Sequence, residues 1–329
     1  MWDVLVAKQE YVLFLAAIMV ASGIIKDKNY FGVLFGVLIS HIKSKRLLVF
    51  LVSLVSGVLP VPGRVSVSAA VLDTLASQEP ESRSKFGIID YLATHHYYLW
   101  SPLEKTVILP MGVLGLSYVG VLSYTWPLLL VSLLYIGFFI CTTIKEKDVV
   151  ISHDGYNSPK SLTWTLLPLF LGIGLLIGGY EGWLIFMGLA LYYMITAKTW
   201  DIVKYLNWKL LMMVVGVILV SNFIGIYYEE VQAYVGAENG LAWAAFFSFC
   251  ASFVLGSSGK FIGITVLLAQ VFGLQYFTLF FALEYAAYLI SPTHKCTCIG
   301  KMYFNTPFLT YAKVLGVWAA LVVLVGIMV

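Results

Sequence analysis

Apolar residues form long runs that cover most of the chain, and short clusters of Lys, Asp, Gly and Pro separate these runs. A helix needs about 20 apolar residues to cross the hydrocarbon core of a bilayer, or fewer where its ends reach the interface. The runs therefore predict an all-α polytopic membrane protein. Uninterrupted spans are expected at residues 11–25, 30–42, 119–143, 162–179, 183–197, 207–228 and 309–328, of which 30–42 is the shortest.

Two longer apolar stretches are interrupted at their centres by helix-breaking residues. Residues 47–77 contain Pro60-Val61-Pro62-Gly63-Arg64, and residues 241–272 contain Gly256-Ser257-Ser258-Gly259-Lys260. Each apolar half has about 14 residues, which is too short to cross the bilayer. The pattern predicts two re-entrant helical hairpins, which are tolerated at membrane depth where the exposed backbone is buried in protein or lines a wet cavity.

Each hairpin is followed by an apolar helix with a proline-containing interruption. Residues 86–114 contain Ser101-Pro102-Leu103-Glu104-Lys105, and residues 274–304 contain Ser291-Pro292-Thr293-His294-Lys295. Proline lacks a backbone donor and breaks a helix at such a position. Two broken transmembrane helices are expected here.

The hairpin and the broken helix recur in the same order. Gly259 follows Gly63 by 196 residues, and Ser291 follows Ser101 by 190. Such spacing is typical of internal repeats with discontinuous helices around a central site. We predict a first repeat at residues 1–144, a linker and connecting helix at 145–182, and a second repeat at 183–329. The alternative is that both motifs recur by chance in a glycine-rich membrane protein.

The composition agrees with membrane insertion. Hydrophobic residues make up 60% of the chain and charged residues 11%, so a soluble protein could not cover its surface with polar groups. The net charge of +3 includes no basic block, and a nucleic-acid partner is not expected. No cleavable signal peptide is expected either, because the first apolar run follows Glu10 and ends at Lys26 without a small-residue cleavage site.

The positive-inside rule gives an orientation. With a cytoplasmic N-terminus, only Lys26 and Lys28 fall outside, together with the acidic residues Glu181, Glu229, Glu230 and Glu238. The basic residues expected on the cytoplasmic side are Lys8, Lys43, Lys45, Arg46, Arg83, Lys85, Lys145, Lys147, Lys160, Lys198, Lys204, Lys209 and Lys301. The helix at 162–179 adds a single membrane crossing between the repeats, so the second repeat has the opposite orientation in the membrane to the first. We expect the protein in the cytoplasmic membrane of a prokaryote.

Four basic residues coincide with the predicted interruptions: Arg64, Lys105, Lys260 and Lys295. The N-termini of half-helices carry unpaired N–H groups and a partial positive charge, and they bind anions. Charges at membrane depth indicate function by default, so an anionic substrate is predicted. Alternatively, Arg64 and Lys260 reach the interface or form structural ion pairs with Asp73, Asp90, Glu104 or Glu284.

Small hydroxyl side chains near the hairpin tips are suitable ligands for Na⁺, which takes oxygen donors from unwound backbone and side chains. The ion-coupling residues that we predict are Ser66, Ser68, Asp73 and Thr265. The hydroxyls could instead serve helix packing, and buried Asp73, Asp90, Glu104 or Glu284 could carry protons. Na⁺ or H⁺ is the expected coupling ion, and no other cofactor is expected.

Residues His294-Lys295-Cys296-Thr297-Cys298 form a weak metal-site fragment, because structural zinc requires four ligands and usually a Cys-x₂₋₄-Cys spacing. We expect no metal there. His95 and His96 are expected to pack or hydrogen-bond near the first broken helix, with a proton relay as the alternative. Because no nucleophile elbow, phosphate loop or His-Glu-x-x-His pattern occurs, an enzyme is not expected.

Several segments resemble the integral membrane family known as "domain of unknown function 401". They are residues 57–63, 68–73 and 255–259, and above all Tyr288 to His294 followed by Tyr303-Phe304. The resemblance implies membership of the ion transporter superfamily, with inverted repeats, a homodimer, and a transport domain that moves as an elevator. It also implies sites at the tips, at Pro62, Gly63 and Ser257 to Gly259. Because the tips lack the Ser-Asn-Thr sequence of dicarboxylate symporters, dicarboxylate specificity does not follow.

The expected function is a secondary active transporter of a small anionic solute, coupled to Na⁺ or H⁺. The alternatives are a passive channel or exporter subunit that needs a partner, and a membrane enzyme using His294, Cys296 and Cys298. The predicted substrate-binding residues are Pro62, Gly63, Arg64, Ser101, Lys105, Ser257, Ser258, Gly259, Lys260, Ser291, Thr293, His294 and Lys295.

Overall fold

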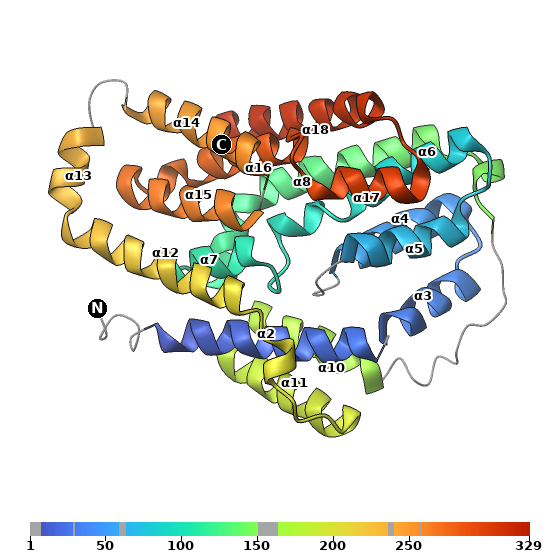
Figure 1. The fold of residues 1–329 in the computed structure, drawn as a ribbon, viewed down its shortest axis with the longest axis horizontal. Helices are drawn as coiled ribbons and strands as arrows, with labels where there is room; N and C mark the ends of the chain where they lie inside the picture. Colours follow the sequence, from blue (N-terminus) through green and yellow to red (C-terminus); the bar gives the residue numbers. More distant parts are fainter. Residues whose placement is uncertain (1–7, 29, 59–63, 151–163, 236–239, 257) are drawn as a thin grey trace.

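The computed structural model describes residues 8–28, 30–58, 64–150, 164–235, 240–256 and 258–329 (Figure 1). Helices account for nearly all of this part of the chain, and Ala76 and Val149 form an isolated β-bridge. The prediction of an all-α protein is confirmed.

Within the described ranges, four helices are long and apolar enough to cross a membrane: α2 (Gln9–Asp27), α8 (Tyr118–Thr143), α12 (Trp208–Ile226) and α18 (Phe308–Met328). They match four predicted spans to within two residues at each end. Helix α2 is more than half buried, but most residues of α8, α12 and α18 are not, and large apolar side chains such as Phe138 and Leu324 are exposed. Such a surface is stable against lipid, so the chain is a membrane protein.

Two pairs of shorter helices occupy the positions of the predicted hairpins. Helix α4 (Lys45–Val58) packs against α5 (Arg64–Leu75), and α14 (Gly240–Leu255) packs against α15 (Ser258–Phe272). The 14 residues of α4 and the 16 of α14 are about 21 Å and 24 Å long, shorter than a hydrocarbon core of about 30 Å.

Both interrupted helices are present. The first consists of α6 (Pro80–Ala93), η1 (His96–Leu99) and α7 (Lys105–Leu114), and the second of η4 (Leu274–Tyr276), α16 (Phe277–Ile290) and α17 (Lys295–Phe304). Helix α6 begins six residues before the predicted start because Pro80 is favourable at the first turn of a helix.

The first interruption begins earlier than predicted, directly after Ala93. Thr94 Oγ1 donates a hydrogen bond to Asp90 O at 2.7 Å, and His95 Nδ1 lies 2.6 Å from Tyr91 O. These side chains bind the carbonyls at the end of α6, and such local bonds compete with continuation of a helix. The helix therefore ends eight residues before Ser101.

The remaining helices are α3 (Tyr30–His41), η2 (Glu146–Asp148), α10 (Leu167–Ile177), α11 (Gly182–Ala197), η3 (Val203–Tyr205) and α13 (Tyr228–Val235). Helix α10 has only 11 residues, fewer than the predicted span at 162–179. It packs against α11, and α11 lies along α2. Helix α13 carries Glu229 and Glu230 in its first turn.

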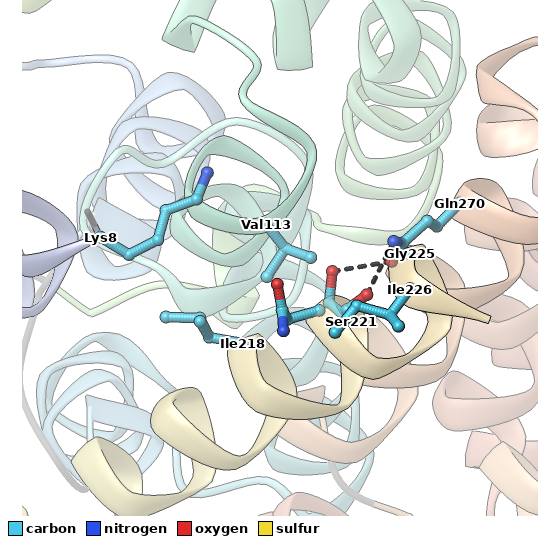
Figure 2. A pocket seen from close by; sticks show the side chains of 8 residues that line it. Lys8, Val113, Ile218, Ser221, Gly225, Ile226 and Gln270 are labelled. Atoms are coloured by element: carbon cyan, nitrogen blue, oxygen red, sulfur yellow. Dashed lines mark hydrogen bonds between the residues drawn. The ribbon is translucent and has the colours of Figure 1, made fainter. Parts of the chain in front are cut away.

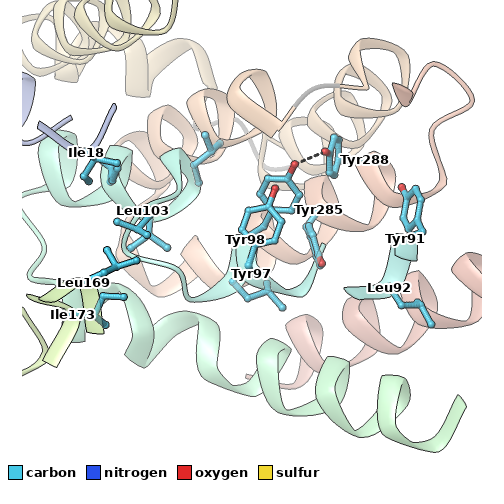
Figure 3. Packing of buried hydrophobic residues seen from close by; sticks show 14 of the residues in the cluster. Ile18, Tyr91, Leu92, Tyr97, Tyr98, Leu103, Leu169, Ile173, Tyr285 and Tyr288 are labelled. Carbon is cyan, nitrogen blue, oxygen red and sulfur yellow. Dashed lines mark hydrogen bonds between the residues drawn. The ribbon is translucent and has the colours of Figure 1, made fainter. Parts of the chain in front are cut away.

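The two interrupted helices lie between the two pairs of short helices (Figure 1). Helix α5 packs against α17, and α15 packs against α7, so each pair contacts the interrupted helix from the other half of the chain. Helices α8 and α18 pack against each other and against α16. Buried tyrosines and aliphatic side chains fill the space between these helices (Figure 3).

Basic side chains join several chain segments at one end of the molecule. Lys45 Nζ donates hydrogen bonds to Glu146 O at 2.8 Å and Val149 O at 2.7 Å, and Arg83 donates one to Tyr303 O at 2.6 Å. The starts of α4, α6 and α18 therefore lie together with the ends of α8 and α17. We call this the basic end.

The end of α2 lies beside the connection between α11 and α12. Lys204 Nζ forms an ion pair with Asp27 Oδ2 at 2.5 Å. The charge pattern of the sequence predicts Lys26 and Lys28 on the opposite side from Lys204, and this relative placement is wrong. Helix α3 has 12 residues, or about 18 Å, and is too short to carry the chain across the bilayer after α2.

Labelling in sealed vesicles tests this arrangement. In a background without the native cysteines, Lys28→Cys and Lys204→Cys are expected to react with a membrane-impermeant maleimide from the same side. Glu181→Cys, which lies near Tyr11 at the start of the spanning helix α2, should react from the opposite side and serves as the control. Labelling of Lys28→Cys and Lys204→Cys from opposite sides would show that α3 crosses the membrane.

Asp148 lies at the basic end, where three groups contact its carboxylate. Burial opposes the charge of its carboxylate, but the Ser82 hydroxyl, the Lys145 N–H and the Lys85 ammonium together lower its pKa. A carboxylate in an unfolded chain has a pKa of about 3.9. The stabilisation is therefore complete above that pH and is lost as the pH falls through the folded-state value.

Asp148→Asn is expected to destabilise the protein at pH 7 by about 1–3 kcal/mol, because three donors lose a charged acceptor. It should also weaken the fall in melting temperature between about pH 4 and pH 2. Thermal unfolding in detergent over this range measures both effects. Glu146→Gln, an exposed residue of the same turn, is the control, and equal behaviour of the two variants would contradict the prediction.

Candidate functional site

The two interruptions meet at a buried polar centre. Tyr98 Oη and Tyr288 Oη are 2.8 Å apart (Figure 3), and His95 Nε2 and His294 Nε2 are 2.9 Å apart. Tyr285 Oη donates a hydrogen bond to His95 O at 2.9 Å. All five side chains are at most 5% exposed. The chain thus brings polar groups from both halves into contact where little water can reach them.

Side chains of α7 and α8 form hydrogen bonds with the backbone of the first interruption. Thr125 and Tyr118 of α8 donate hydrogen bonds to Leu99 O and Trp100 O, both at 2.7 Å. Thr106 Oγ1 donates one to Tyr98 O at 2.5 Å. These bonds satisfy carbonyls that no longer have partners within a helix.

Side chains of the second interruption form hydrogen bonds with the backbone at the end of α14. Ser291 Oγ donates a hydrogen bond to Phe253 O at 2.5 Å, and Thr293 Oγ1 donates one to Val254 O at 3.0 Å. Gly256 follows with a φ of +52°, and a Cβ on this residue would overlap Thr293 Oγ1. The predicted site residues Ser291 and Thr293 are therefore in contact with the second pair of short helices.

Each half of the chain places a buried carboxyl beside a hydroxyl. Thr265 Oγ1 of α15 donates a hydrogen bond to Glu284 Oε2 of α16 at 2.8 Å. In the first half, Ser68 of α5 lies close enough to Asp90 of α6 to interact with its carboxyl. All four side chains are at most 1% exposed.

Both acids retain an unused acceptor. Asp90 Oδ1 and Glu284 Oε1 are buried without a hydrogen-bond partner, and so is Ser68 Oγ. Buried polar atoms nearly always have partners, so such atoms indicate a site that accepts an additional proton, ion or water. Thr265 follows Ser68 by 197 residues and Glu284 follows Asp90 by 194, close to the spacing of the predicted repeats.

Other predicted residues have different surroundings. Asp73 forms an ion pair with Arg83 at 2.6 Å and is not brought together with Ser68 or Thr265. Lys105 Nζ lies 3.7 Å from Glu104 Oε1 at the start of α7. Ser101 is buried and its hydroxyl accepts a hydrogen bond from Leu103 N at 3.3 Å.

Part of the predicted site lies outside the described residues. These are Pro62, Gly63 and Ser257, together with the side chains of Arg64, Ser66, Ser258, Lys260, Lys295 and Cys298. Gly259 lies in the first turn of α15. The helix bounds still place Arg64, Lys105 and Lys295 as the first residues of α5, α7 and α17, and Lys260 as the third residue of α15.

A cavity of about 250 Å³ lies between α7, α12 and α15 (Figure 2). Ser221 Oγ donates a hydrogen bond to Gln270 Oε1 at 2.7 Å beside it, and Lys8 adds a positive charge. Its lining residues are Lys8, Val113, Ile218, Ser221, Asn222, Gly225, Ile226 and Gln270. None of them was predicted as a site residue, because they come from four distant segments and share no motif.

These features define an all-helical integral membrane protein with a buried polar centre between two interrupted helices. The chain belongs to the family described as "Protein of unknown function (DUF401)", whose model matches residues 6–329. The resemblance found in the sequence is thereby confirmed at the level of the family. No curated protein matches the chain.

The contact between Gly256 and Thr293 yields a prediction. Gly256→Ala should destabilise the protein by about 1–3 kcal/mol, since alanine is strained at a positive φ and its Cβ meets the Thr293 hydroxyl. Gly216→Ala, in α12 with open space around it, is the control. In a Thr293→Ala background the effect should shrink but persist, as measured by thermal unfolding. If Gly256→Ala destabilises the Thr293→Ala background as much as the wild-type protein, a clash with the Thr293 hydroxyl is excluded as a cause.

Proposed function

We propose that this protein is a secondary active transporter of a small anionic solute, coupled to Na⁺ or H⁺. The observation that carries the proposal is the position of Arg64, Lys105, Lys260 and Lys295 in the first turns of four short helices. A cation at a helix N-terminus opposes the helix dipole, and a charge at membrane depth is costly. An anion bound between such helix starts would stabilise both the dipoles and the side-chain charges.

We infer that the two halves are inverted repeats, as the ion transporter superfamily resemblance implies. Helices α6 and α16 each have 14 residues, and α7 and α17 each have 10. Each interrupted helix follows a pair of short helices and precedes a long one. Helix α8 ends at the basic end whereas α18 begins there, which supports opposite orientations.

The carboxyl and hydroxyl pairs support cation coupling. Glu284 with Thr265, and Asp90 with Ser68, provide oxygen donors in equivalent positions on the two halves. A carboxyl at this depth accepts either a proton or Na⁺, and either would neutralise a negative charge in the membrane. We therefore add Asp90 and Glu284 to the coupling residues expected from the sequence and give Asp73, which pairs with Arg83, a structural role.

The closed centre favours alternating access over the alternative of a passive channel or exporter subunit. The cavity of Figure 2 includes none of the residues of the interruptions, and between the interruptions the rings of Tyr98 and Tyr288 and of His95 and His294 pack against each other. Access would then require relative movement of helix groups. We infer an elevator-like movement of α4 to α8 and α14 to α18 against α2 and α10 to α12, in a homodimer.

We further infer that the basic end faces the cytoplasm of a prokaryotic cell, following the positive-inside rule. The pairing of Asp27 with Lys204 puts Lys26 and Lys28 on the same side as Lys204, whereas Lys8 stands at the start of α2. With Lys204 on the cytoplasmic side, we infer that the start of α2 faces outside, opposite to the N-terminal orientation expected from the sequence.

Flux into proteoliposomes tests the proposal. Candidate anions are first screened by thermal shift with and without Na⁺, since a ligand that binds the folded state raises its stability. Uphill uptake of a stabilising anion that requires an imposed Na⁺ or pH gradient is expected. Equilibration that is independent of both gradients would instead identify a passive channel.

The coupling residues yield a separate prediction. Glu284→Gln and Asp90→Asn are each expected to reduce gradient-driven uptake at least tenfold, because an amide does not carry the coupling charge. Glu229→Gln, exposed on α13, is the control. Variants are compared after size-exclusion chromatography to confirm folding, and unchanged uptake by folded Glu284→Gln would exclude this residue from coupling.

A further inference from the structure

Three potential metal ligands converge where the interruptions meet. They are His95, which directly precedes η1, His294, which precedes α17, and Cys296, the second residue of α17. Their ligand atoms all lie within 4.8 Å of one another. His95 and His294 are at most 2% exposed, whereas Cys296 is only partly buried. An ion could therefore approach from the Cys296 side.

The surroundings of His95 orient its ring for ligation. Its Nδ1 lies 2.6 Å from Tyr91 O, which can only accept, so this nitrogen carries the proton. The Nε2 atom then carries a lone pair that is directed at His294. A histidine that donates one N–H to a backbone carbonyl while the other nitrogen faces an ion is the usual arrangement in metal sites.

His294 completes the pair. With His95 Nε2 as acceptor, His294 Nε2 must donate the hydrogen bond of 2.9 Å between them, which leaves His294 Nδ1 unprotonated. This Nδ1 atom is buried and has no hydrogen-bond partner. If this proton moves from Nε2 to Nδ1 of His294, the Nε2 lone pair of His294 faces the Nε2 lone pair of His95. The proton then lies on His294 Nδ1, which carries no proton in the first tautomer.

We propose that His95, His294 and Cys296 bind a transition metal ion of the Zn²⁺ class, with a fourth position open to water. Two imidazoles and one thiolate suit Zn²⁺, whereas Mg²⁺ and Ca²⁺ prefer oxygen ligands. Tetrahedral bonds of about 2.0–2.1 Å separate two nitrogens by about 3.3 Å, so the rings need to part by only a few tenths of an ångström. The Cys296 thiol releases its proton to solvent as the metal–sulfur bond forms.

The site would link the two halves of the chain. His95 belongs to the first interruption, and Cys296 belongs to the first turn of α17 after the second. A bound ion would hold these segments together and oppose any movement that separates them. Metal binding is thus a property beyond the proposed transport, and its test does not depend on transport.

Metal content and spectroscopy of the purified full-length protein test the proposal. After dialysis against Zn²⁺, we expect one ion per chain by mass spectrometry. Co²⁺ in place of Zn²⁺ should give a thiolate-to-metal charge-transfer band in the near ultraviolet. Cys296→Ser should abolish this band, and His95→Gln should weaken Zn²⁺ binding at least tenfold, whereas Cys141→Ser, an exposed cysteine in α8, should change neither.

An independent measurement on the wild-type protein covers the case in which a histidine variant fails to fold. Bound Zn²⁺ should protect Cys296, but not Cys141, from alkylation by a maleimide, as read by peptide mass spectrometry. Equal labelling of Cys296 with and without Zn²⁺ would overturn the proposal. A charge-transfer band that persists in Cys296→Ser would overturn it as well.

Discussion

Backbone that leaves helical geometry inside a membrane must find hydrogen-bond partners within the protein, because lipid supplies none. Much of the arrangement around the two interrupted helices follows from this requirement. Thr106, Thr125 and Tyr118 donate hydrogen bonds to backbone carbonyls of the first interruption. Ser291 and Thr293 of the second interruption donate hydrogen bonds to backbone carbonyls at the end of α14. The hydroxyl groups that make the interruptions possible also make the centre polar. A polar centre and a stable broken helix thus have the same structural origin.

The positions of the interruptions could be predicted from the sequence because proline and glycine act locally. Ser-Pro in two apolar helices and glycine-rich segments in two others mark where helices end, whatever the rest of the chain does. The early end of α6 was missed because Thr94 and His95 bind carbonyls of the preceding turn. Such a bond depends on side-chain geometry, and threonine and histidine also occur within helices.

Contacts between the halves could not be predicted from the sequence. His95 and His294 are 199 residues apart, and no spacing rule relates them; His294 alone suggested only a weak motif with Cys296. Asp90 and Glu284 were recognised as candidate proton carriers, but Thr265 as the partner of Glu284 depends on how α15 packs against α16. The proximity of Lys28 to Lys204 follows from the Asp27–Lys204 ion pair, which joins residues 177 positions apart and could not be predicted from local sequence.

The hydroxyl pair of Tyr98 and Tyr288 has a further consequence. Either oxygen can be the donor, so the bond can reverse its polarity by rotation of two hydrogen atoms while every heavy atom stays in place. A fixed dipole in a dry interior would always favour one sign of charge beside it. A dipole that can reverse favours neither sign, so the polar centre can adjust its electrostatic field without any change in packing.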